Sequence, residues 1–90
     1  MYTFAERLTH DGFWQLCLRV EGQTYLWSLV CNGVPFLNAE ARQSAEALKK
    51  LISVVVECEN DFVKYFRFKD RYQEILKTLN RRLGEEEFWR

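Results

Sequence analysis

Apolar and polar residues alternate along two neighbouring stretches of the chain, residues 13–20 and 23–31. Alternation with a period of two gives a β-strand one apolar face, so each stretch predicts a strand. Glu21 and Gly22 separate the stretches and predict a hairpin with a two-residue connection. In that register the large apolar residues face one another across the two strands as Trp14 with Leu29, Leu16 with Trp27, and Leu18 with Tyr25.

A third short stretch, residues 2–8, precedes the hairpin and is also predicted to be a strand. The tetrapeptide at 9–12, Thr-His-Asp-Gly, has the composition of a turn, because glycine readily takes a positive φ. The first 31 residues therefore predict a three-stranded antiparallel sheet with one apolar face. The expected pairs between its first two strands are Phe4 with Leu18 and Leu8 with Trp14.

Helical spacing of apolar residues replaces the alternation in the rest of the chain. Pro35 cannot donate to a strand ladder and is predicted to end the third strand. Asn38 is the candidate N-cap of a helix over 38–59, and Gly84 is the candidate stop of a second helix over 62–83. The predicted fold is α+β, with both helices packed on one face of the sheet.

One alternative concerns the junction between these two helices. Residues 53–58 contain a β-branched run, which also suits a strand. Glu59-Asn60-Asp61 would then be the turn of a second hairpin, with residues 62–68 as its other strand. The sequence leaves open whether residues 53–68 are helical or form that hairpin.

Length and composition predict one folded domain over residues 1–90, with residues 85–90 as a mobile or docking tail. The chain is 48% hydrophobic and 16% aromatic, which excludes a chain that lacks the apolar surface to fold. Thirteen basic side chains balance thirteen acidic ones, so the charge excess typical of a dedicated nucleic-acid-binding protein is absent.

The three cysteines, Cys17, Cys31 and Cys58, are widely spaced and odd in number, which does not suggest a disulfide framework. We expect reduced thiols and a cytoplasmic protein. No apolar run approaches the roughly 18 residues of a membrane span, and the N-terminal residues lack the pattern of a signal peptide. No membrane association is expected.

Residues with known chemistry are too few and too scattered to predict an active site. The single histidine, His10, lies in a predicted turn, and no cluster has the ligand spacing of a metal site. The isolated glycines form no phosphate-binding loop. We therefore expect no enzymatic activity, no catalytic residues, no metal and no cofactor.

Aromatic residues are more numerous than one small core can bury, and aromatics and arginine are enriched where proteins bind proteins. The sequence predicts a non-enzymatic binding protein, such as an inhibitor, an adaptor or an accessory factor of a mobile element, with a protein partner. A homodimer held by the second helix or the C-terminal tip is also expected. The alternative is a nucleic-acid-binding regulator that uses the basic second helix. The candidate partner-binding residues are Phe62, Phe66, Phe68, Arg67, Arg71, Phe88 and Trp89.

Overall fold

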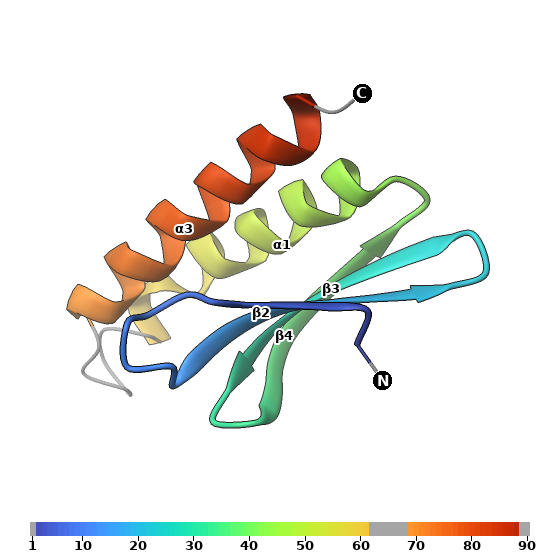
Figure 1. Cartoon of the computed structure of the whole chain (residues 1–90). Helices are drawn as coiled ribbons and strands as arrows, with labels where there is room; N and C mark the ends of the chain where they lie inside the picture. The colour runs from blue at the N-terminus through green and yellow to red at the C-terminus, as the bar shows by residue number, and fades with distance from the viewer. Residues whose placement is uncertain (1, 62–68, 89–90) are drawn as a thin grey trace.

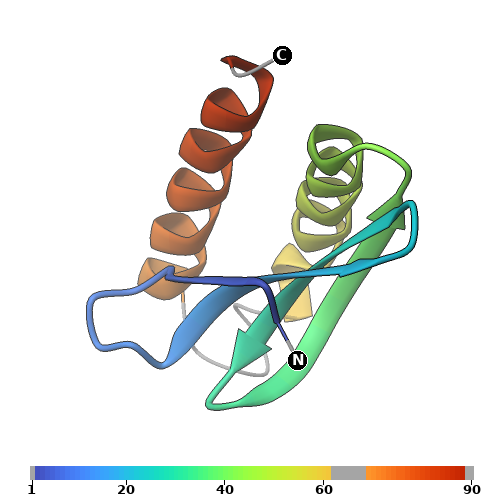
Figure 2. The same cartoon turned by 45° about the vertical axis from the view of Figure 1, so that its right-hand side comes forward.

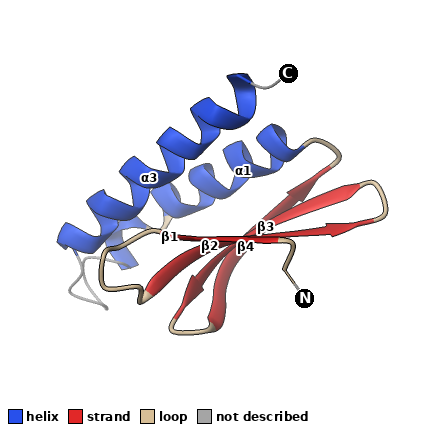
Figure 3. Cartoon of the chain, viewed as in Figure 1, coloured by secondary structure: helices blue, strands red, loops and turns tan. Residues whose placement is uncertain are grey.

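The chain forms an antiparallel sheet with helices packed against one of its faces (Figure 1, Figure 3). The computed structural model describes residues 2–61 and 69–88. This arrangement confirms the predicted α+β class, with one strand more than expected. The elements are β1 (Phe4–Arg7), β2 (Trp14–Glu21), β3 (Thr24–Cys31), β4 (Val34–Ala41), α1 (Ser44–Glu57) and α3 (Lys69–Phe88).

The strands lie in the sheet in their order along the chain, β1-β2-β3-β4, and each is antiparallel to the next. The first three strands begin and end within two residues of the predicted ranges. The expected pair of Phe4 with Leu18 is confirmed. The backbone N–H of Leu8 donates to the Trp14 carbonyl oxygen at 2.9 Å, which confirms the second expected pair.

The predicted register of the central hairpin is wrong by two residues. Leu16 pairs with Leu29 and Leu18 pairs with Trp27, because the connection is Gly22-Gln23 and not Glu21-Gly22. Gly22 takes a φ of +58° as the first of the two turn residues, a position that glycine fills without strain. A shift of two residues leaves every side chain on the same face, so the apolar pattern alone could not exclude it.

Strand β4 contradicts the prediction that Pro35 ends the sheet and that a helix begins at Asn38. Asn32 and Gly33 both have positive φ values, 51° and 81°, as in the tight turn that joins two antiparallel strands. Pro35 is tolerated because β4 is an edge strand and its pairing has an irregularity opposite Leu29 and Val30. Residues 34–41 therefore complete the sheet, and the helix starts six residues later than predicted.

Helix α1 runs through the β-branched residues and ends at Glu57. The alternative in which residues 53–58 form a strand is therefore wrong, and its second strand, 62–68, lies outside the described residues. The buried residues of α1 are Ala45, Ala47, Leu48, Leu51 and Val55, which recur at helical spacing.

Helix α3 is longer at its C-terminal end than predicted and runs to Phe88. The expected stop, Gly84, lies inside the helix and does not have a positive φ. Arg81 and Arg82 form ion pairs with Glu85 one turn further on, and such pairs stabilise a helix across this position. The predicted start of this helix, at residue 62, falls outside the described residues.

The core lies between the helices and the sheet, and Figure 2 shows both helices on the same side of the strands. Trp14, Leu16, Trp27 and Leu29 supply the sheet side, as the period-two pattern predicted. Helix α1 adds Leu48, Leu51 and Val55, and α3 adds Tyr72, Ile75 and Leu79. In the described part of the chain, no helix or strand packs on the opposite face, which we call the open face, although Cys17, Ser28 and Val30 on it are buried.

Candidate interaction surface

Only two of the seven residues predicted to bind a partner lie in the described part of the chain. Arg71 is in the first turn of α3, and Phe88 is its last residue, with 79% of its surface exposed. Seventeen residues of helix place their backbones about 25 Å apart, so the structure does not bring the two together. The other five, Phe62, Phe66, Arg67, Phe68 and Trp89, lie outside the described residues.

The basic residues of α3 are largely paired with acidic residues. Arg71 lies 3.0 Å from an Asp11 carboxylate oxygen and 3.4 Å from one of Glu74. Arg81 forms ion pairs with Glu6 in β1 and Glu85, and Arg82 forms one with Glu85 at 2.8 Å. The helix therefore presents less unpaired positive charge than its sequence suggested.

These pairs also fasten α3 along β1 and the turn that follows it. The Arg82 guanidinium lies 4.2 Å from the centre of the Phe4 ring, in cation–π geometry. The Thr78 hydroxyl donates to the Leu8 carbonyl oxygen at 3.4 Å, and the backbone N–H of His10 donates to Glu74 at 3.0 Å. These contacts join α3 to side chains of β1 and to the turn that follows it.

Two carboxylates in this region are held in their ionised form. Bonds donated by the Thr9 hydroxyl and the backbone N–H of Phe13 lower the pKa of Asp11, and Arg71 adds to the effect. Burial raises the pKa of Glu74, but the bonds from His10 and the charge of Arg71 together outweigh it and lower the pKa overall. Both pKa shifts keep these carboxylates charged, which favours the contacts that join the β1–β2 turn to α3.

Exposed apolar side chains gather at the end of the sheet where β3 turns into β4. Val34 is 65% exposed, Phe13 43% and Phe36 37%. Phe13 accepts a backbone bond from Asn32, and Phe36 packs edge-on against the buried Trp14 with ring centres 5.8 Å apart. We call Phe13, Val34 and Phe36 the hairpin-end patch.

The hairpin-end patch was missed by the sequence interpretation. None of the residues from Asn32 to Ala39 is charged, although the exposed turn between β3 and β4 would tolerate charged side chains. The signal that could have found it is the dipeptide Asn32-Gly33 between apolar residues, which is the strongest short sequence mark of a hairpin. Such a hairpin would have placed Val34 and Phe36 at its exposed start.

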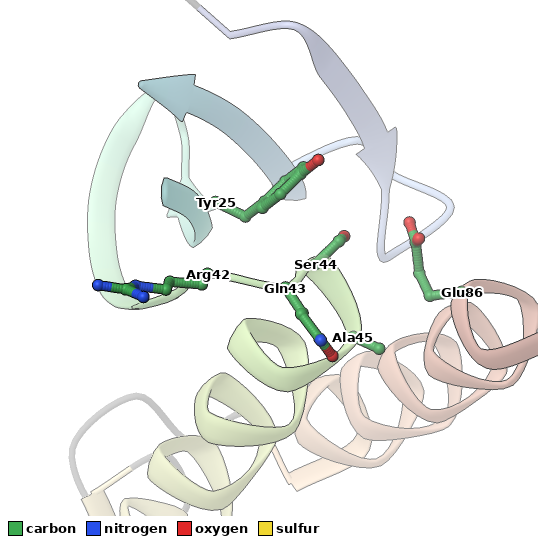
Figure 4. A pocket seen from close by; sticks show the side chains of 6 residues that line it. All are labelled: Tyr25, Arg42, Gln43, Ser44, Ala45 and Glu86. Carbon is green, nitrogen blue, oxygen red and sulfur yellow. The ribbon is translucent and has the colours of Figure 1, made fainter. Parts of the chain in front are cut away.

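The structure contains a cleft of about 400 Å³ beside the first turn of α1. Figure 4 shows Tyr25 from β3 on one side of it and Glu86 from α3 on the other. Its polar groups include one cation, Arg42, and one anion, Glu86, which lies 3.7 Å from the Nε of Arg82. This mixture does not select a ligand of one charge, and we assign none to the cleft.

The described residues contain neither a metal-binding cluster nor a helix that could cross a membrane. No group of three or more histidine, cysteine, aspartate or glutamate side chains there could hold a metal ion. None of the helices in residues 2–61 and 69–88 is both long and apolar enough to cross a bilayer.

Burial raises the pKa of the Cys17 and Cys31 thiols, which disfavours the reactive thiolate at both positions.

The described residues thus define a small α+β protein whose helices cover one face of a four-stranded antiparallel sheet. Comparisons with protein-family models, with curated proteins and with solved structures find no match. The surfaces of the chain are therefore the basis for a functional proposal.

Proposed function

We propose that this chain is a non-enzymatic binding protein that acts through protein–protein contacts, with the hairpin-end patch as its contact surface. The observation that supports the proposal is the exposure of three large apolar residues, Phe13, Val34 and Phe36, at the end of the sheet where β3 turns into β4. Removing such side chains from water on binding contributes about 25 cal/mol per Å² of apolar area. An inhibitor, an adaptor and an accessory factor would all act through contacts of this kind.

The fixed position of Phe36 and the absence of charge in the turn also suit a protein partner. Phe36 rests on the buried ring of Trp14, so its position is fixed before a partner arrives. Aromatic side chains that are already ordered make effective anchors, because little conformational entropy is lost when they bind. The β3–β4 turn carries no charge that would have to be desolvated.

The nucleic-acid alternative receives less support. Phosphate binding needs lysine and arginine side chains that are available to replace counterions. Arg71, Arg81 and Arg82 instead form ion pairs with Asp11, Glu6, Glu85 and neighbouring carboxylates. In the described part of the second helix, these three arginines are therefore used within the fold.

The proposal is tested by affinity capture with three forms of the chain. Each tagged form (wild type, Val34→Asp and Val20→Asp) is incubated with an extract of cells whose genome encodes the protein. The proteins that each form retains are compared by mass spectrometry. Val20 is an exposed apolar residue of β2, 38% accessible, and serves as the matched control away from the β3–β4 turn. We expect a protein that wild type and Val20→Asp retain and Val34→Asp loses. Equal retention by all three forms would contradict the proposed surface.

A further inference from the structure

The two edges of the sheet differ in length. The β1 edge has four residues and is fastened to α3 by the Arg81–Glu6 ion pair and the contact of Arg82 with the Phe4 ring. The β4 edge has eight residues and one charged side chain, Glu40. In the described residues no strand lies outside β4. Natural sheets shield long edges, because unpaired backbone groups are available to bind another strand.

The ladder determines which backbone groups of β4 point outward. In an antiparallel sheet the N–H and C=O of successive residues point alternately to the two sides of the strand. Leu8 bonds to the carbonyl of Trp14, and Asn32 bonds to the carbonyl of Phe13, which fixes the alternation in β2. The residues of β2 that share the parity of Phe13 point toward β3, and their partners in β3 point back toward β2. The alternate residues of β3 therefore point toward β4, and their partners Leu37, Ala39 and Ala41 point toward β3. The backbone groups of Asn38 and Glu40 therefore face outward.

Among the described residues, one of these outward groups has a hydrogen-bond partner. The Lys50 ammonium donates to the Glu40 carbonyl oxygen at 3.4 Å, from the exposed side of α1. This contact confirms the outward direction of that carbonyl. Lysine is a common shield of edge strands, so pairing through β4 requires the Lys50 side chain to move away from this carbonyl.

We propose that two copies of the chain pair through β4, antiparallel about a twofold axis at Ala39, and form one continuous eight-stranded sheet. A dimer was expected from the sequence, with its contact on the second helix or the C-terminal tip. The geometry points instead to residues 37–41 of β4. This inference concerns self-association and stands independently of the partner proposed for the hairpin-end patch.

The register follows from which residues point outward. Backbone bonds form between outward-facing residues, so the twofold axis can lie at Asn38, Ala39 or Glu40. An axis at Glu40 places two carboxylates opposite each other, which is unfavourable. An axis at Asn38 places Glu40 opposite Phe36, at the irregular part of the strand. An axis at Ala39 uses only the regular part.

The axis at Ala39 also gives complementary side chains. Asn38 of each copy lies opposite Glu40 of the other, on the open face, where the amide can donate to the carboxylate. The pair occurs twice in the dimer. On the helix face the residues that meet are Leu37 with Ala41 and Ala39 with itself, and the small alanines let the two strands approach. A twofold axis is the commonest symmetry of soluble oligomers.

Sedimentation equilibrium over a range of concentrations tests the proposal with two substitutions at one exposed position. Asn38→Lys would place a cation opposite Glu40 of the other copy, and Asn38→Glu would place a second carboxylate there. Both replace the same exposed polar residue, so each is the control for the other, and circular dichroism checks that both fold. Cross-strand pairs of this kind contribute about 0.2–1 kcal/mol each, and two pairs change the dissociation constant by roughly 2- to 30-fold.

The expected result is a dimer that Asn38→Lys tightens and Asn38→Glu weakens, with both effects reduced by added salt. Three outcomes overturn the proposal. A monomeric mass for wild type and Asn38→Lys at every concentration excludes the dimer. A dimer that neither substitution changes lies on another surface. Weakening by both substitutions, or tightening by Asn38→Glu, would place the twofold axis at Asn38 or Glu40 and contradict the proposed register.

Discussion

The indole Nε1 of Trp27 donates a hydrogen bond to the Ser44 carbonyl oxygen at 2.9 Å and lies 3.1 Å from the Ser44 hydroxyl oxygen. Trp27 is fully buried in β3, and Ser44 is the first residue of α1. The bond thus joins the centre of the sheet to the start of the helix that covers it. It also satisfies the single polar group of a buried tryptophan, which would otherwise be costly to bury.

Trp27→Ala is expected to destabilise the fold by about 3–5 kcal/mol, the usual cost of truncating a buried large aromatic residue. Trp27→Phe is the control: it keeps an aromatic ring in the core but removes the N–H, and it should cost less. Urea denaturation followed by circular dichroism measures both. An unchanged midpoint for Trp27→Ala would show that the helices do not cover this face of the sheet.

Gly84→Ala is expected to stabilise the chain by about 0.5–1 kcal/mol, because glycine inside a helix costs conformational entropy. A Cβ at this position would have no atom within 4 Å apart from the adjacent residues and the backbone of its own helix. The matched control is Gly22→Ala, which forces alanine to a φ of +58° and should destabilise. If Gly84→Ala destabilised the chain as Gly22→Ala does, α3 would end at Gly84, as the sequence alone predicted.

Asp11 is expected to make the folding stability of the chain depend on pH. Its pKa in the folded chain is lowered from 3.8, so its contribution is present above that value and is lost as the pH falls through the folded-state pKa. Asp11→Asn removes the charge that pairs with Arg71 but keeps a similar shape. Near neutral pH the wild type should therefore be more stable than the variant, and the difference should close as the pH falls through the lowered pKa of Asp11. A difference that is constant from neutral to acid pH would contradict this role.

Cys17 is expected to be a slowly reacting thiol. Its side chain is buried in β2, and burial raises its pKa, so little thiolate is available at neutral pH. Titration with a coloured disulfide reagent should count all three cysteines in denaturant and show a slow phase in the folded chain. Cys17→Ser should remove that slow phase. Rapid reaction of all the thiols in the folded wild type would show that this part of the sheet is open to solvent.

The strands with a clear period of two could be predicted from the sequence, since the pattern fixes which face of each strand is buried. Leu16 and Trp27 were placed on the apolar face for this reason, and both are in the core. Their register could not be predicted, because moving one strand by two residues preserves both faces. The turn residue Gly22, whose φ is positive, is what distinguishes the two registers.

Strand β4 could not be predicted from local preference. Its residues include Pro35 and two alanines, which are poor strand formers, and Asn38 resembles a helix cap. Pairing with the apolar strand β3 outweighs these preferences, an effect of tertiary structure. A break at Pro35 also leaves the hairpin-end patch unpredicted, since Val34 and Phe36 are exposed there only as part of β4. The surplus of aromatic residues did suggest a binding surface, although the sequence favoured other positions for it.

The fold and the proposed dimer both require β4 to be an edge strand with Asn38 and Glu40 facing outward, and residue-resolved amide hydrogen exchange measures this. In dilute solution we expect the inward amides of Leu37, Ala39 and Ala41 to be protected and the outward amides of Asn38 and Glu40 to exchange rapidly. At high concentration Asn38 and Glu40 should gain protection, as their groups pair with a second copy. Uniform protection from Asn38 through Ala41 at every concentration would indicate a helix or a covered strand and would contradict the account.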